Sequence, residues 1–89
     1  MKAIVTVIGK DRVGIIHQVS GLLSENKVNI LDISQTIMQE YFTMIMLVDT
    51  SLLPISFAEL SEKLMEAGEK MGLSIRIQRE DSFEAMHRI

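Results

Sequence analysis

The alternation of two hydrophobic periodicities along the chain restricts the fold more than any other feature of the sequence. Four segments are apolar runs or carry apolar residues at every second position, which is typical of strands. Two further segments carry apolar residues every three or four positions, as on one face of a helix. The expected strands are residues 3–8, 28–38, 41–48 and 73–79, and the expected helices lie between Gly14 and Asn26 and between Ser56 and Gly72.

This β-α-β-β-α-β order favours an α+β fold, a ferredoxin-like sandwich with a four-stranded antiparallel sheet and both helices on one face. Right-handed crossovers place the first and third strands centrally, which gives the strand order 4-1-3-2. Strand 3–8 is expected to be buried on most of both faces, because only Thr6 in it is polar. The polar residues Asp32, Ser34 and Thr36 suit an edge position for strand 28–38. With 89 residues there is room for one core, so residues 1–80 are expected to form one domain.

One face of this sheet is left uncovered although it is apolar. Ile4 and Ile8 alternate with the residues expected to face the helices, and strand 41–48 is apolar on both faces. A large exposed apolar surface usually indicates association. We therefore expect a homodimer or a higher homo-oligomer.

Residues 81–89 extend beyond the last strand and predict a short C-terminal helix. Asp81 and Glu84 resemble a capping box, and Phe83, Met86 and Ile89 recur every three residues. Because a helix of this length is unstable alone, this tail is expected to pack on the domain or on a partner subunit.

The composition argues against several classes of protein. The net charge is −3 and the nine Lys and Arg residues are scattered, so no nucleic-acid partner is expected. No apolar run approaches the length of a membrane span, and the N-terminus lacks the features of a signal peptide, so we expect no membrane partner and a cytoplasmic location. Cysteine is absent, and His17 and His87 lack metal-ligand spacing. No catalytic residues, metal or cofactor are therefore predicted, and the chain is not expected to be an enzyme.

The segment GKDRVGI, residues 9–15, is the strongest candidate for a binding site. A helix that begins near Gly14 presents free backbone N–H groups and the positive end of its dipole, which attract a carboxylate. Lys10 and Arg12 add positive charge, and Asp11 can accept a hydrogen bond from an ammonium group. The structural alternative is that Asp11 or Gly14 only caps the helix.

Asn29 opens the second strand, at the opposite end of the helix from this segment. Within one subunit the two are therefore expected to be distant. If the second strand is an edge that pairs with its mate, the partner's Asn29 can approach the loop. The alternative for Asn29 is an ordinary turn residue.

DRVGI at 11–15, VNI at 28–30 and the later segments DISQTIM, EYFTM and FEAMHRI resemble the ACT domain, in particular the stand-alone single-ACT-domain proteins near the glycine-cleavage-regulator-like group of unknown function. This resemblance implies a regulatory module that binds an amino acid between paired subunits. It assigns Asp11, Gly14 and the partner's Asn29 to the ligand, whereas Arg12 is a candidate through its positive charge alone. It also implies that Val13 and Ile15 line the pocket, with Val13 in place of the proline that many members have.

Two alternative functions stay open. One is a ligand-free protein–protein interaction module, whose partner would be another ACT-bearing protein. The other is an acylphosphatase-like hydrolase, for which Arg12 is the only phosphate-binding candidate in the first loop. The ligand, the regulated target and the choice between dimer and tetramer are also left open.

Overall fold

Six elements follow one another in the computed structural model in the order that the sequence predicts. The structure describes residues 1–10 and 13–81. The elements are β1 (Lys2–Lys10), α1 (Ile15–Glu25), β2 (Asn29–Met38), β3 (Tyr41–Asp49), α2 (Phe57–Met71) and β4 (Leu73–Arg79).

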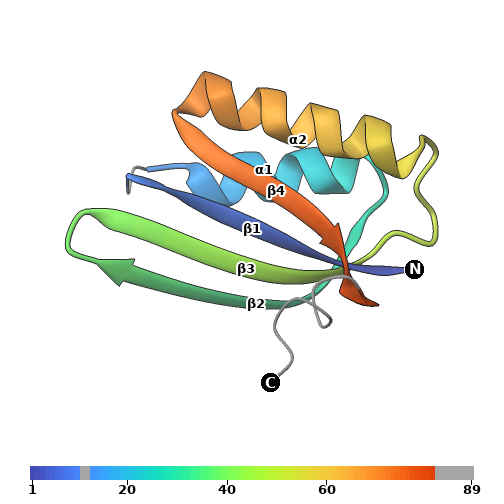
Figure 1. Ribbon diagram of the computed structural model, residues 1–89, viewed down its shortest axis with the longest axis horizontal. Coiled ribbons are helices and arrows are strands. Elements are labelled where there is room, and N and C mark those ends of the chain that lie inside the picture. The colour runs from blue at the N-terminus through green and yellow to red at the C-terminus, as the bar shows by residue number, and fades with distance from the viewer. Residues whose placement is uncertain (11–12, 82–89) are drawn as a thin grey trace.

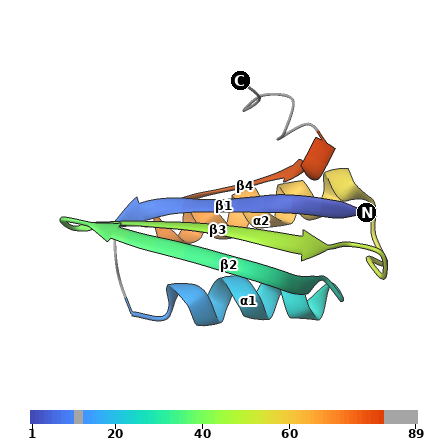
Figure 2. The ribbon, with the colours of Figure 1, turned by 90° about the horizontal axis from the view of Figure 1, so that it is seen from below.

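The strands form one antiparallel sheet in the order β2-β3-β1-β4. This is the predicted order 4-1-3-2 read from the other edge. Both helices lie on the same side of the sheet, as Figures 1 and 2 show from two directions. The predicted ferredoxin-like sandwich is therefore confirmed, with β2 and β4 as its edges.

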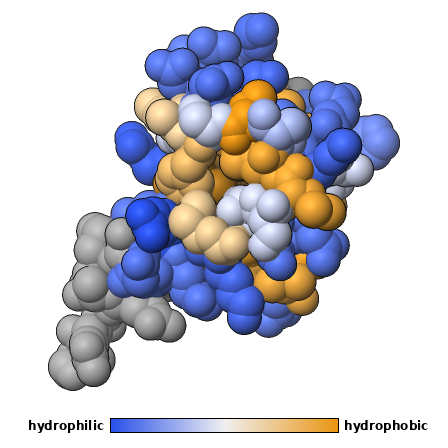
Figure 3. Space-filling model, turned by 90° about the vertical axis from the view of Figure 1, so that its right-hand side faces the viewer, coloured by the Kyte–Doolittle hydropathy of each residue, from blue (hydrophilic) through white to orange (hydrophobic). Residues whose placement is uncertain are grey.

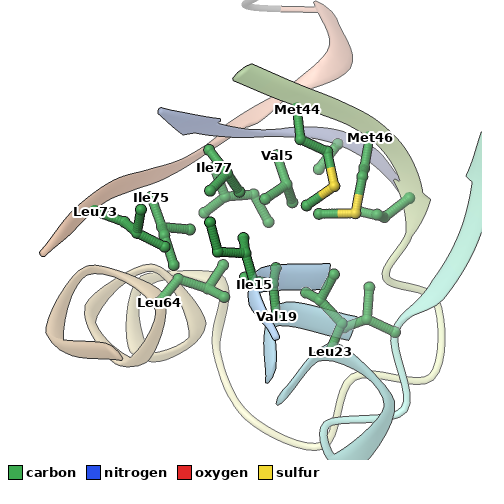
Figure 4. Packing of buried hydrophobic residues seen from close by; sticks show 14 of the residues in the cluster. Val5, Ile15, Val19, Leu23, Met44, Met46, Leu64, Leu73, Ile75 and Ile77 are labelled. Carbon is green, nitrogen blue, oxygen red and sulfur yellow. The ribbon is translucent and has the colours of Figure 1, made fainter. Parts of the chain in front are cut away.

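The core lies between the sheet and the helices (Figure 4). Alternate residues of the two central strands point into it, and the buried positions of α1 and α2 recur every three or four residues. The buried apolar residues are Ala3, Val5, Val7, Ile15, Val19, Leu23, Val28, Phe42, Met44, Met46, Val48, Leu60, Leu64, Leu73, Ile75 and Ile77.

The expectation that strand 3–8 is buried on most of both faces is wrong. Ala3, Val5 and Val7 are fully buried, but on the opposite face Ile8 is 46% exposed and Ile4 is only partly buried. The reason is that both helices cover the same face, so no described helix covers the other.

The first strand is longer than predicted, because it includes Gly9 and Lys10, which the sequence placed in the loop. These residues pair with Phe42 and Tyr41 of β3. Gly9 lies close to Leu73, so a Cβ added at this position would meet the end of the Leu73 side chain, which would have to shift. The loop before α1 therefore begins only after Lys10.

The helix ends follow the predicted local signals, with one difference. At the start of α2, the backbone N–H of Glu59 donates to Ser56 Oγ at 3.1 Å, as a capping box predicts. At the end of α1, Asn26 is the C-cap residue, but its φ is −97°, and Lys27 adopts the left-handed conformation instead. Asn26 is held by a hydrogen bond from its Nδ2 to the carbonyl of Leu22, at 2.9 Å.

A β-bulge at Leu31 interrupts the pairing of β2 with β3. Ile30 pairs with Val48, whereas Asp32 pairs with Leu47. As a result, Ile30 and then Ile33, Gln35 and Ile37 lie opposite the residues of β3 that face the helices.

The predicted C-terminal helix falls largely on residues 82–89, which lie outside the described residues. In the described part of the chain, no helix is long and apolar enough to cross a membrane.

Candidate groove between helix α1 and edge strand β2

Among the described residues, no side chain caps the first turn of α1, so its backbone donors are available. Gly14 is the N-cap residue, with φ 93° and ψ 0°, and it provides no side-chain hydrogen bond. The first backbone bond of the helix runs from the N–H of Gln18 to the carbonyl of Gly14, at 2.9 Å. The preceding N–H groups of the helix have no intrahelical acceptor, and no acidic residue lies in this turn. This end of α1 therefore suits an anionic group.

A groove is formed where this turn faces the C-terminal half of β2. Its volume of about 610 Å³ lies within the range of small-ligand sites. Buried Ile15 and Phe42 line its inner side, and Gln35 and Ile37 of β2 line one wall. The full lining is Gly14, Ile15, Ile16, His17, Ser20, Gln35, Ile37 and Phe42.

The groove continues along α1 toward the start of β2. The second section has a volume of about 430 Å³ and shares His17 and Ser20 with the first. It ends at Asn29 and Ile30, near the C-terminal end of the helix. The hydroxyl of Ser20 donates to the carbonyl of His17 at 3.3 Å, within the wall common to both sections.

The structure brings some of the predicted site residues together and keeps others apart. Gly14 and Ile15 both border the first section of the groove, although Ile15 is only 2% exposed. Val13 is 99% exposed and does not line the groove in one subunit. Asn29 lies at the far end of α1, as expected within a single subunit. Asp11 and Arg12 lie outside the described residues.

Several groove residues were not singled out by the sequence reasoning. Gln35 and Ile37 belong to the wall because the bulge at Leu31 sets the phase of β2. The available signal was the recurrence of Ile33 and Ile37 on a strand expected at the edge. Ser20 and Phe42 gave no signal beyond helix and strand periodicity.

The outer side of β2 is an unprotected edge. The strand is ten residues long and contains one charged residue, Asp32. Leu31, Ile33, Ile37 and Met38 are between 43% and 70% exposed. Long edges with exposed apolar residues and few charges readily pair with another strand.

No cluster of metal-ligating side chains accompanies the groove in the described part of the chain. The geometry is that of a mixed apolar and polar cleft next to a helix N-terminus and a free sheet edge.

Comparison with protein families shows which family the chain belongs to. Residues 2–78 match the model of the ACT domain. The chain belongs to the ACT domain family. An ACT domain protein of Streptococcus pneumoniae, with a solved structure, is similar to it at 44% identity and a TM-score of 0.83, over 98% of each chain.

Relatives of this ACT domain occur in bacteria and archaea. A UPF0237 protein of Clostridium acetobutylicum is 62% identical over the whole length of both chains. A UPF0237 protein of Methanocaldococcus jannaschii is 52% identical, over 99% of this chain and 98% of its own. This chain and these two relatives are thus similar over nearly their full lengths.

Proposed function

We propose that this ACT domain is a regulatory module that acts as a homodimer and binds a small amino acid between its subunits. The observation that carries the proposal is the groove that joins the uncapped N-terminus of α1 to the exposed edge strand β2. A site at an open edge is incomplete in one subunit and is closed by whatever pairs with that edge.

A free amino acid fits the chemistry of this groove. Its carboxylate would accept hydrogen bonds from the N–H groups of the first turn of α1, where the helix dipole also favours negative charge. Its ammonium group would bind the side chain of Asp11, with Arg12 assisting on the carboxylate. Val13 would close over a ligand when a second subunit is present, since 99% of it is exposed in one subunit.

The homodimer would form by antiparallel pairing of β2 with the β2 of a second subunit. With the two-fold axis near the middle of β2, Asn29 of one subunit lies opposite Met38 of the other. Met38 pairs with Tyr41, and Tyr41 pairs with Lys10, the last residue of β1. The partner's Asn29 would therefore approach the segment that leads into Gly14.

Isothermal titration of the purified chain with each of the twenty amino acids tests this function. At least one is expected to bind, and Asp11→Ala and Asn29→Ala should each weaken binding tenfold or more, since each removes about 1.4 kcal/mol of charged or polar contact. Glu62→Ala, on the exposed face of α2, is the matched control and should bind as the wild type does.

A folded dimer that shows neither heat nor thermal shift with any amino acid would rule out the ligand. The ligand-free interaction module is then the better account, and the exposed apolar edge of β2 favours it. It predicts capture of an ACT-bearing partner that survives both Asp11→Ala and Asn29→Ala.

A further inference from the structure

The open face of the sheet carries an apolar strip along its two central strands. Ile4 of β1 pairs with Leu47 of β3, and farther along the same face Ile45 pairs with Thr6 and Ile8 pairs with Thr43. Ile8 and Ile45 are 46% and 39% exposed. Figure 2 looks onto this face, which α2 does not cover. The outer strands are polar here, so the apolar strip is narrow and runs along the strands.

The described chain ends beside one end of this strip. Arg79, the last residue of β4, pairs with Ala3, and Gln78 pairs with Ile4. Glu80 and Asp81 follow in helical conformation. Oδ1 of Asp81 lies 3.6 Å from Nε of Arg79. The described chain therefore ends beyond the Ile4 end of the strip, on the side of β4.

We propose that residues 82–89 dock as a short helix on the open face of the sheet of their own chain. Phe83, Met86 and Ile89 would fall within about 120° of a helix surface. Eight helical residues span about 12 Å, and the four steps from Ile4 to Ile8 span about 13 Å, so segment and strip match in length. Glu84 and Arg88 would lie about 160° from the centre of that apolar side, so both charges would point away from the strip.

Two other arrangements compete with this one. The strip could be covered by the sheet of a second copy. Alternatively, the segment could dock at the end of the molecule that carries the N-terminus, where apolar side chains gather amid hydrophilic ones (Figure 3). The loop at that end contains Leu52, 74% exposed, and Ile55. The length match and the starting point of the segment favour the strip.

The absence of cysteine allows a direct test. Arg88→Cys places a single nitroxide spin label on the side of the proposed helix opposite its apolar residues. Isoleucine methyl NMR then reports which surface the label approaches. Ile8 and Ile45 methyls are expected to lose most of their intensity, whereas Ile16 and Ile37 in the groove and Ile55 in the loop should keep theirs.

Docking within one chain and docking between chains are distinguished by mixing methyl-labelled chain that has no spin label with an excess of spin-labelled chain that has no methyl label. Docking within one chain predicts little broadening in the mixture. Broadening there, or broadening at Ile55, Ile16 or Ile37 in place of the strip, would overturn the proposal. So would unchanged methyl intensities throughout.

A pair of variants checks the docking surface itself. Ile45→Lys should restore the intensity of the Ile8 methyl in the spin-labelled chain, because it places a charge in the strip. Met65→Lys, on α2 and similarly exposed at 43%, should leave the broadening unchanged. The strip does not line the α1–β2 groove, so loss of tail docking and loss of amino-acid binding are separate results.

Discussion

Asp49 joins the end of β3 to the loop that follows it. Its Oδ1 accepts hydrogen bonds from the backbone N–H of Ser51 at 2.9 Å and from the Ser51 hydroxyl, and it lies 3.8 Å from the Met1 ammonium group. The hydrogen bonds from Ser51 hold the pKa of the Asp49 carboxyl below its ordinary value, with a smaller contribution from the Met1 charge. The ionised form is therefore favoured by folding.

This shift predicts a pH-dependent contribution to stability. Because the pKa of Asp49 is lower in the folded chain than in the unfolded chain, its contribution is fully present above the unfolded pKa and is lost as the pH falls through the folded pKa. Asp49→Asn should thus lower the free energy of unfolding at pH 7 more than at acid pH. Urea unfolding followed by circular dichroism between pH 7 and pH 3 measures the difference.

The companion variant is Ser51→Ala, which keeps the carboxylate but removes one of its donors. It should remove only part of the pH dependence. An Asp49→Asn deficit that is the same at pH 7 and at pH 3 would contradict the assignment.

At the scale of elements, two glycines inside helices have opposite surroundings. A Cβ added at Gly21 of α1 meets nothing within 4 Å, whereas one added at Gly68 of α2 lies 2.7 Å from the carbonyl oxygen of Leu73. Gly68 therefore allows α2 to approach β4 closely, while Gly21 carries only the backbone entropy cost of a helical glycine.

The same substitution should consequently change stability in opposite directions. Gly21→Ala is expected to raise the free energy of unfolding by about 0.5–1 kcal/mol. Gly68→Ala is expected to lower it by about 1–3 kcal/mol, because the backbone of Leu73 must shift. Urea titrations of both variants against the wild type test this, and two changes of the same sign would contradict it.

Most elements could be predicted because their signals are local. The apolar spacing from Ile15 to Leu23 and the capping box at Ser56 each specify a helix within a few residues of sequence. The extension of β1 to Lys10 and the bulge at Leu31 could not be predicted, because both depend on which residues of β3 lie opposite. Gly14 could be found because its spacing is a local signal. Gln35 and Ile37 could not be found, because their place in the groove wall depends on the bulge in the pairing with β3.

On the scale of the whole molecule, the two sheet edges differ in exposure. β2 is long and carries exposed apolar residues, whereas β4 is shorter and exposes Arg76 and Arg79. Charged side chains at an edge disfavour strand addition. The proposed homodimer should therefore use β2 and leave β4 free.

Lysine substitutions at one serine on each edge strand test which sheet edge forms the dimer. Ser34 near the middle of β2 and Ser74 on β4 are both exposed and lie on the same face of the sheet. Ser34→Lys brings two like charges together at a β2–β2 junction and should weaken dimerisation tenfold or more, about 1.4 kcal/mol. Ser74→Lys should not change it.

Sedimentation equilibrium over a range of chain concentrations measures both variants. If Ser74→Lys dissociates the dimer and Ser34→Lys does not, the subunits associate through the opposite edge, and Asn29 has no route to the partner's groove.

The bulge at Leu31 also indicates where this protein can change in length. Leu31 is the extra residue between Ile30 and Asp32, and their partners Val48 and Leu47 are consecutive in β3. Loss of this one residue would leave every other cross-strand pair intact. Loss of Asp32 with the bulge retained, in contrast, would turn the strand beyond it over and would present Ser34, Thr36 and Met38 to the helices in place of Ile33, Gln35 and Ile37. Insertions and deletions in β2 should therefore be confined to this point, which separates variation in chain length from the chemistry of the groove.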